Sequence, residues 1–142
     1  MKLIVASDEK TSLTDSVIKY LQEKGHKLIL LGNLVDEHKK WKWVEIGKEA
    51  TERITQKEAE QGILFCWSGT GVCMAANRLK CIRAALCWDA EAAKLARKWD
   101  NANVLCLSLR FTSKTVAKEI LDVWFATEFN EEGLNEAYKL DE

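Results

Sequence analysis

The sequence predicts an α/β domain in which helices cover both faces of a parallel, five-stranded sheet. Short apolar runs alternate with amphipathic helical segments along the 142 residues, an order that is typical of repeated βαβ units. The runs are apolar almost throughout, as expected for strands that are buried on both faces. Right-handed crossovers should connect them. We therefore predict one Rossmann-like domain, a three-layer α/β/α sandwich over residues 1–142, with residues 130–142 as a C-terminal arm.

The first half of the chain is predicted to supply two strands and two helices, with a polar, charged loop before the second helix. Each strand is a short apolar run, and each helix has apolar residues on one face at helical spacing. Gly25 is the expected stop of the first helix, because glycine readily adopts the left-handed conformation that follows a helix. The elements are expected at 2–6 (strand), 14–24 (helix), 27–31 (strand), 33–42 (loop) and 44–55 (helix).

The second half repeats the same alternation. Asp89 is the expected N-cap of one helix, and Ser113 or Thr112 that of the next. Leu95 and Trp124 are expected to pack inward. The elements are expected at 62–66 (strand), 72–79 (helix), 82–86 (strand), 89–98 (helix), 104–107 (strand), 115–126 (helix) and 134–140 (a short helix or an arm).

Length, charge and composition narrow the class of protein. A chain of 142 residues is long enough for one domain with a substantial core. The formal net charge is −1, which points to neither a nucleic acid nor a membrane as partner. No apolar run approaches the roughly 18 residues of a membrane-spanning helix. An acid at Asp8 comes too early for a signal peptide, so we expect a cytoplasmic protein.

The five cysteines form no recognisable framework. Their number is odd, and they lack the paired spacing of a zinc site. Most of them should be reduced, buried and apolar in character. We therefore predict neither a disulfide framework nor a bound metal. The cysteines are Cys66, Cys73, Cys81, Cys87 and Cys106.

The segment 62–71 is the most informative part of the sequence. An apolar run ends at Cys66, a Gly-rich turn follows at once, and the next residues are predicted to be helical. The carboxyl ends of parallel strands are where ligands bind in such sheets. The N–H groups of the turn and the positive end of the helix favour an anion there, and the same field favours a thiolate. Cys66 is thus either a base or nucleophile beside an anion hole or a buried strand cysteine.

Polar residues follow four of the five predicted strands. Alone, each is explained by a helix cap or a turn. Because the carboxyl ends of parallel strands share one edge of the sheet, we expect an acid, a thiol, hydroxyls and an arginine to meet there. The segments are Ser7–Asp8, Cys66–Gly71, Trp88–Asp89 and Ser108–Arg110.

The chain resembles the family of ribose-5-phosphate isomerase B and galactose-6-phosphate isomerase over nearly its whole length. Supporting matches are Ser7–Asp8 and Asn101–Val104. The combination is specific. The resemblance is strongest in Gly62–Cys66, Gly69–Gly71, Ala75–Arg78 and Ile82–Cys87.

The resemblance implies aldose–ketose isomerisation of a sugar phosphate through an enediolate, without a metal or cofactor. It also implies a homodimer or homotetramer with the active site at the subunit interface. Cys66 matches the catalytic cysteine, Ser68 retains a hydroxyl where threonine is usual, and Asp8 matches the acid that holds substrate hydroxyls. Backbone N–H groups would stabilise the negative charge of the intermediate. They belong to Ser68, Gly69, Thr70 and Gly71.

The sequence also departs from the family pattern. Glu9 replaces a histidine after the first strand, and Trp99-Asp100 replaces the His-Asn pair whose histidine is credited with opening the sugar ring. Arg110 survives after the fifth strand, but the arm has lost the arginines that grip phosphate. These changes lower the expectation of ribose 5-phosphate as substrate.

Tryptophans stand at or near several expected pocket positions. Their indole faces could stack on the C–H surface of a sugar, and core packing is the alternative. Candidate substrate-binding residues are therefore Trp67, Trp99 and Trp43. The positions that match the family's site add Asp100, Glu9 and Arg110 as further candidates. The four tryptophans are Trp43, Trp67, Trp88 and Trp99.

Three functions remain open at this point. The chain could be an active isomerase for another sugar, phosphorylated or not. It could be one subunit of a mixed enzyme, in which an unlike partner chain supplies the missing histidine or arginines. It could also be a non-catalytic sugar-binding protein on the same scaffold, because a fold does not determine a function.

Overall fold

Strands and helices alternate along the chain in the predicted order. The computed structural model describes residues 1–142, apart from the side chains of residues 133–135. The strands are β1 (Lys2–Ser7), β2 (Lys27–Gly32), β3 (Gln61–Cys66), β4 (Ala84–Leu86) and β5 (Val104–Ser108). The helices are α1 (Ser12–Glu23), α2 (Trp43–Thr55), α3 (Thr70–Ala76), α4 (Ala90–Asp100), α5 (Lys114–Ala126) and α6 (Leu134–Lys139), with short 3₁₀ turns η1 (Glu37–Lys39) and η2 (Glu131–Gly133).

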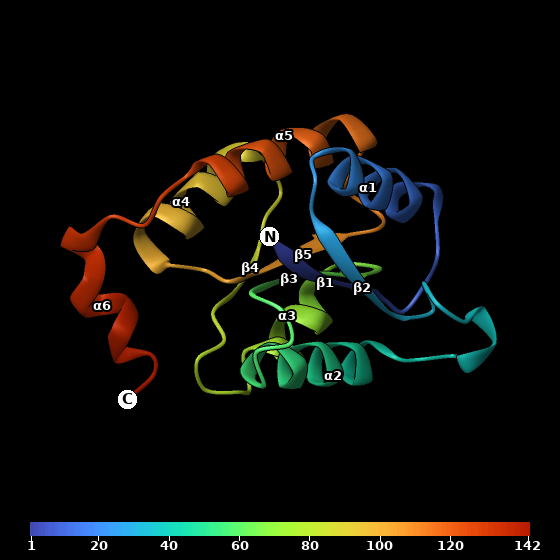
Figure 1. The fold of residues 1–142 in the computed structure, drawn as a ribbon, viewed down its shortest axis with the longest axis horizontal. Coiled ribbons are helices and arrows are strands. Elements are labelled where there is room, and N and C mark those ends of the chain that lie inside the picture. The colour runs from blue at the N-terminus through green and yellow to red at the C-terminus, as the bar shows by residue number, and fades with distance from the viewer.

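The five strands form one parallel sheet in the order β2-β1-β3-β5-β4, which confirms the predicted fold class. Helices α1, α4 and α5 cover one face, and α2 and α3 cover the other (Figure 1). The register pairs Ser7 with Phe65 and Cys66 with Ser108. The chain segments that leave β1, β3 and β5 therefore emerge side by side.

Alternate residues of the central strand feed two separate cores. Ile63 and Phe65 pack with α1, α4 and α5, whereas Leu64 and Cys66 pack on the side of α2 and α3. This arrangement explains why β3 is apolar on both faces, because every residue of the strand is buried. Trp124 lies in the first core, as predicted.

Helix boundaries follow local signals that the sequence shows only in part. Helix α3 begins at Thr70 rather than 72, because Gly69 at φ 79° is its N-cap. Asp89 and Ser113 are the N-caps of α4 and α5, as predicted. The expectation for Leu95 is wrong: its side chain is 45% exposed, since α4 buries Ala93 and Ala96 on its inner face instead.

Strand β4 is shorter than predicted, starting at Ala84 rather than 82. Cys81 adopts a left-handed conformation at φ 68°, which breaks the extended run before it. Arg83 then gives its N–H to the side chain of Asn103 at 2.8 Å rather than to a strand neighbour. The start of this strand is thus set by side chains that lie far away in sequence.

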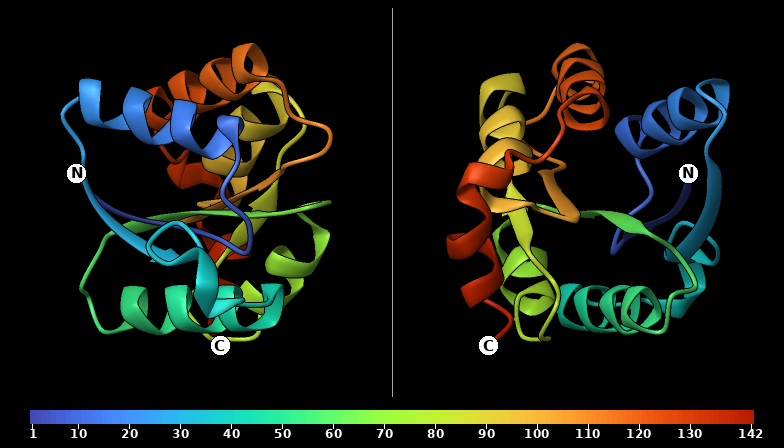
Figure 2. Two further views of the ribbon diagram at one scale, coloured as in Figure 1. Left: turned by 90° about the vertical axis from the view of Figure 1, so that its right-hand side faces the viewer. Right: turned by 60° about the vertical axis from the view of Figure 1, so that its left-hand side comes forward.

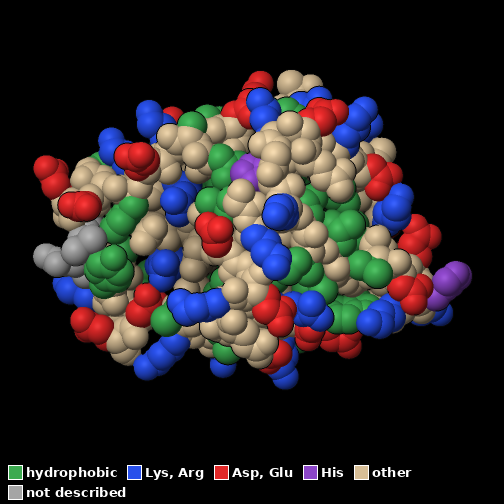
Figure 3. Space-filling model, in the orientation of Figure 1, with side chains coloured by type: hydrophobic (Ala, Val, Ile, Leu, Met, Phe, Trp, Pro, Cys, Tyr) green, Lys and Arg blue, Asp and Glu red, His purple; other side chains and the backbone are tan. Residues whose placement is uncertain are grey.

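The C-terminal arm, residues 130–142, crosses the edge of the sheet next to β4. Figure 2 shows it running from the α4 side of the sheet toward the side that carries α2 and α3. Helix α6 of this arm contacts α4. Lys/Arg and Asp/Glu side chains are interspersed over the face in Figure 3, in line with the net charge of −1. None of the helices described is long and apolar enough to cross a membrane.

Candidate active site

The carboxyl edge of the sheet brings together most of the predicted site residues. Three neighbouring strands, β1, β3 and β5, end there in register. The residues that follow them are Asp8 and Glu9, the loop from Trp67 to Thr70, and Arg110. The sequence expectation that these segments share one edge is confirmed by the strand order.

Cys66 is the last residue of β3 and lies on the side of α2 and α3. Its side chain is 4% exposed, and Val72 of α3 belongs to the same core cluster. Its backbone carbonyl accepts the N–H of Leu109 at 3.0 Å, which ties the end of β3 to the loop after β5. The thiol is thus buried beneath the surface of this sheet edge.

The loop after Cys66 is shaped by one glycine and two hydroxyls. The Ser68 and Thr70 side-chain oxygens lie 2.6 Å apart, and Ser68 Oγ accepts the Thr70 N–H at 3.3 Å. Gly69 combines φ 79° with close neighbours, because an added Cβ would lie 2.6 Å from Leu86 Cδ1. The backbone of this loop therefore approaches β4 and β5 more closely than any other residue type would allow.

Trp43 stands over the start of α3. A Cβ added at Gly71 would meet the Trp43 ring at 2.7 Å, so the indole lies directly on the glycine. Trp43 is still 43% exposed at the first turn of α2. Gly71, the second glycine of the predicted loop, thus leaves room for the Trp43 ring. The motif alone does not reveal this contact.

Arg110 and Trp67 lie next to each other beside the Cys66 loop. The Trp67 carbonyl accepts the Arg110 N–H at 3.0 Å and the Ser108 hydroxyl at 2.8 Å. The Arg110 guanidinium lies 5.9 Å from the centre of the Trp67 ring and 5.4 Å from that of Phe111. A cation held over aromatic faces beside the Cys66 loop is well placed to receive an anion.

Asp8 is the acid of the edge. Its Oδ1 is buried and finds no hydrogen-bond donor among the residues that the structure describes. Burial, reinforced by the neighbouring Glu9, raises the pKa of the Asp8 carboxyl, while a hydrogen bond from its own backbone N–H and the charge of Lys42 act in the opposite direction. Asn33 donates to the Asp8 carbonyl and so holds its backbone. An unsatisfied acceptor at a ligand edge suits a hydroxyl-bearing substrate.

Glu9 and Trp88 also lie at this edge, but further out. The Glu9 N–H is held by Ser7 Oγ at 3.1 Å, and its side chain is exposed. Trp88 follows β4 and is 56% exposed. Neither forms a hydrogen bond with Cys66 among the described residues, so Glu9 stays a predicted substrate-binding residue and Trp88 a predicted pocket residue.

Trp99 and Asp100 lie elsewhere. They end α4, which leads into the amino end of β5, so within one chain they stand at the opposite edge from Cys66. Asp100 lines a cavity of about 410 Å³ there, together with Arg83 and Leu140. A single copy of the chain does not bring these two residues to the thiol.

A second thiol was missed by the sequence reasoning. Cys73, on α3, has its pKa lowered to about 7, chiefly by a hydrogen bond from the Cys106 thiol. Burial and the same hydrogen bond raise the pKa of Cys106 well above its ordinary value. The sequence placed Cys73 among buried cysteines, and nothing in its spacing indicates that it meets Cys106.

Comparison with known proteins identifies the family of the chain. The sequence matches the family described as Ribose/Galactose Isomerase over residues 3–142. It is 34% identical to galactose-6-phosphate isomerase subunit LacB of Clostridium acetobutylicum over 115 residues, which cover 80% of this chain and 64% of that protein. It is 35% identical to the D-erythrulose-4-phosphate isomerase of Pectobacterium atrosepticum over 137 residues, which cover 96% of this chain and 85% of the relative.

The solved structures give the same result for the fold. The ribose 5-phosphate isomerase of Thermotoga maritima superposes with a TM-score of 0.90 at 34% identity, over 99% of this chain and 97% of that one. The sequence and fold similarities together define a sugar-phosphate isomerase that is similar to ribose-5-phosphate isomerase B. The chain belongs to the ribose/galactose isomerase family.

Proposed function

We propose that the chain interconverts the aldose and ketose forms of a sugar phosphate through an enediolate, with Cys66 as the base. The observation that carries this proposal is the meeting of Asp8, Cys66, the Trp67–Thr70 loop and Arg110 at one sheet edge. Each contributes a group that the reaction needs: an acceptor for sugar hydroxyls, a thiol, backbone donors and a cation.

The proposed reaction moves one proton from C2 to C1 of the sugar. The Cys66 thiolate removes the proton from C2 of the open-chain aldose, and the electron pair moves to the C1 oxygen. Loop N–H groups stabilise this oxyanion, and such donors can each be worth about 3 kcal/mol in the transition state. The Ser68 hydroxyl relays a proton between the two sugar oxygens. The Cys66 thiol then returns its proton to C1, which yields the ketose.

A second copy of the chain completes the site in this proposal. Trp99 and Asp100 lie at the amino edge, and Trp99 is 41% exposed. A homodimer or homotetramer that places this edge against the Cys66 edge of a neighbour would bring them to the substrate. The relative named as a subunit of galactose-6-phosphate isomerase favours an unlike partner chain as the second candidate.

The substrate is proposed to differ from ribose 5-phosphate. Residues 130–142 contain no arginine to bind phosphate, and Trp67 adds an indole, 54% exposed, beside Arg110. A relative at 35% identity is named for a four-carbon sugar phosphate, so shorter sugars belong in any test. Arg110 is the cation proposed to receive the phosphate.

The test is proton NMR in D₂O with a panel of tetroses, pentoses and hexoses, each with and without phosphate. Loss of the C2 proton signal and appearance of the ketose are expected for one sugar phosphate. Cys66→Ala should abolish both changes. Full turnover by Cys66→Ala would contradict the proposed base, and tight binding of a sugar without exchange would favour the non-catalytic alternative.

A further inference from the structure

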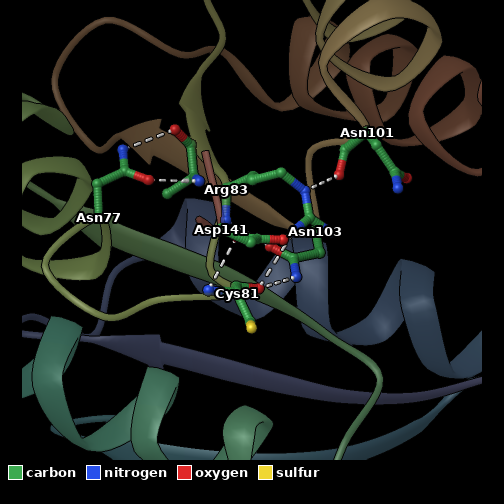
Figure 4. Close-up of polar contacts among 7 residues, drawn as sticks. Asn77, Cys81, Arg83, Asn101, Asn103 and Asp141 are labelled. Carbon is green, nitrogen blue, oxygen red and sulfur yellow. Dashed lines mark hydrogen bonds and ion pairs between the residues drawn. The ribbon is translucent and has the colours of Figure 1, made fainter. Parts of the chain in front are cut away.

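The arm ends in a network that the isomerase site does not include. Arg83, just before β4, points its guanidinium at two segments that are distant in sequence (Figure 4). Its Nη1 donates to Asp141 Oδ2 at 2.9 Å, and its Nε donates to the Asn101 carbonyl at 2.8 Å. The Arg83 side chain is 14% exposed and that of Asp141 is 22% exposed. An ion pair so shielded is held more firmly than one on the open surface.

The same network fixes the turn that follows α4. Asn103 accepts the Arg83 N–H on its side-chain oxygen at 2.8 Å, and its side-chain amide donates to the Cys81 carbonyl at 2.9 Å. The Asn103 N–H in turn donates to the Arg83 carbonyl at 2.9 Å. Residues 81–83 and 101–103 are therefore locked together by both main chain and side chains.

The last residues of the chain close the network from outside. Asp141 Oδ1 accepts the Cys81 N–H at 3.0 Å, and Lys80 Nζ reaches the carbonyl of Glu142 at 3.3 Å. One carboxylate thus bridges the guanidinium of Arg83 and a backbone N–H two residues earlier. The arm is held to the body of the domain at its very end (Figure 4).

We propose that Asp141 and Arg83 form an arm latch, whose function is to fix residues 99–103 and so to set how Trp99 and Asp100 meet the substrate of a neighbouring copy. This inference rests on the proposed function. Asp141 and Arg83 are positioning residues, because they act through the turn and touch no substrate. The latch gives the acidic arm a role other than binding phosphate.

The conformation of the turn supports a positioning role. Asn101 adopts a left-handed conformation at φ 48°, directly after Asp100, and its carbonyl is the atom that Arg83 holds. Asparagine adopts this conformation more readily than most residues with a side chain, so the hydrogen bond from Arg83 fixes the direction of the turn rather than relieving strain. Loss of the latch frees the carbonyl, and the preceding Trp99 and Asp100 then lose their fixed orientation.

The test compares Asp141→Asn with Glu136→Gln. The first replaces one carboxylate oxygen by a donor, which cannot accept from Arg83. The second removes the same charge from the exposed Lys139–Glu136 pair on the same arm. Asp141→Asn is expected to raise the KM of the sugar phosphate about tenfold with kcat within about twofold, because binding contacts are misplaced while Cys66 is intact. Glu136→Gln should leave both unchanged.

Mixed oligomers separate a positioning role from a loss of folding. Co-expression of Cys66→Ala chains with Asp141→Asn chains creates sites that pair an intact Cys66 edge with an intact latch. These mixed sites are expected to regain the wild-type KM, whereas a defect in folding would not be rescued in this way. A mixture that keeps the raised KM overturns the latch.

Amide hydrogen exchange gives a readout that does not depend on turnover. The N–H groups of Cys81, Arg83 and Asn103 should exchange at least tenfold faster in Asp141→Asn than in Glu136→Gln. Equal exchange and equal KM in the two variants would overturn the latch while the proposed function stands. A wild type that exchanges no C2 proton with any sugar would overturn the proposed function, and the role of the latch in it.

Discussion

Asp8 carries an energetic cost that the fold relieves only in part. Its buried Oδ1 has no donor among the described residues, and burial raises the pKa of its carboxyl. A buried acceptor without a partner costs roughly 1–3 kcal/mol. Buried polar groups that lack a partner and lower the stability of the fold are typical of ligand sites, where the ligand supplies the missing partner.

Asp8→Asn should therefore stabilise the free protein and impair turnover. An acid with a raised pKa binds its proton more tightly when folded, so folding stability falls as pH rises from 3.8 through the folded pKa. At pH 7 the variant avoids that loss, so its free energy of unfolding, measured in urea, should exceed that of the wild type by about 1 kcal/mol. The gain should shrink toward pH 3.8. A loss of stability at pH 7 would show that the carboxylate is favourably paired.

Cys73 should be the thiol that reacts at neutral pH. Its pKa is about 7 because Cys106 donates a hydrogen bond to it. Alkylation of the Cys73 peptide by iodoacetamide, followed by mass spectrometry, should be half-maximal near pH 7. Cys106→Ala removes the donor and should slow alkylation at pH 7 about tenfold, as for an ordinary thiol of pKa about 8.5. An unchanged rate would exclude the Cys73–Cys106 hydrogen bond.

At the scale of elements, the loop between β3 and α3 depends on the backbone of Gly69. Ala at this position meets both an unfavourable φ and the close atoms Leu86 Cδ1 at 2.6 Å and Leu107 C at 3.0 Å. Gly25 is a matched control, because it has φ 88° and nothing within 4 Å of an added Cβ. The two glycines share the conformational demand and differ in the space around them.

Gly25→Ala should cost about 1 kcal/mol from its conformation alone. Gly69→Ala should cost about 3 kcal/mol, because overpacking adds roughly 1–3 kcal/mol. Urea unfolding of both variants measures the difference. Equal losses would mean that the loop can move away from β4 and β5, and that its donors are not rigidly placed.

The elements were predictable where one strong local signal sets them. The run to Cys66 is apolar because β3 is buried on both faces, and the caps Asp89 and Ser113 are local hydrogen bonds. Prediction was wrong where tertiary partners decide. The start of β4 depends on Asn103, and Leu95 is exposed because the small residues of α4 face the core.

At the scale of the whole molecule, strand order decides which predicted residues can act together. The sequence predicts that polar residues follow the strands, and the order β2-β1-β3-β5-β4 places Asp8, Cys66 and Arg110 on adjacent ends. Such pairing joins segments far apart in sequence, so no local pattern reveals it. The same holds for the arm latch, whose Arg83 and Asp141 are 58 residues apart.

The whole chain also shows a division between its two edges. The carboxyl edge holds Cys66 and the groups proposed to bind an anion, whereas Trp99 and Asp100 stand at the amino edge, where Asp100 lines a cavity with Arg83. The resemblance to the family predicted Trp99 and Asp100 as substrate-binding residues and implied a site at a subunit interface, but the sequence alone did not show that they lie at the opposite edge from Cys66. Only a neighbouring copy can join them, which makes assembly part of the proposed function.

The most direct test of the central claim is deuterium incorporation at C2 of the sugar phosphate that the panel identifies. Wild type, Cys66→Ala and Cys73→Ala should be measured together, because Cys73 is the competing thiol with a pKa of about 7. Incorporation should be lost in Cys66→Ala and retained in Cys73→Ala. Retention in Cys66→Ala, or loss in Cys73→Ala alone, would contradict the assignment of Cys66 as the base.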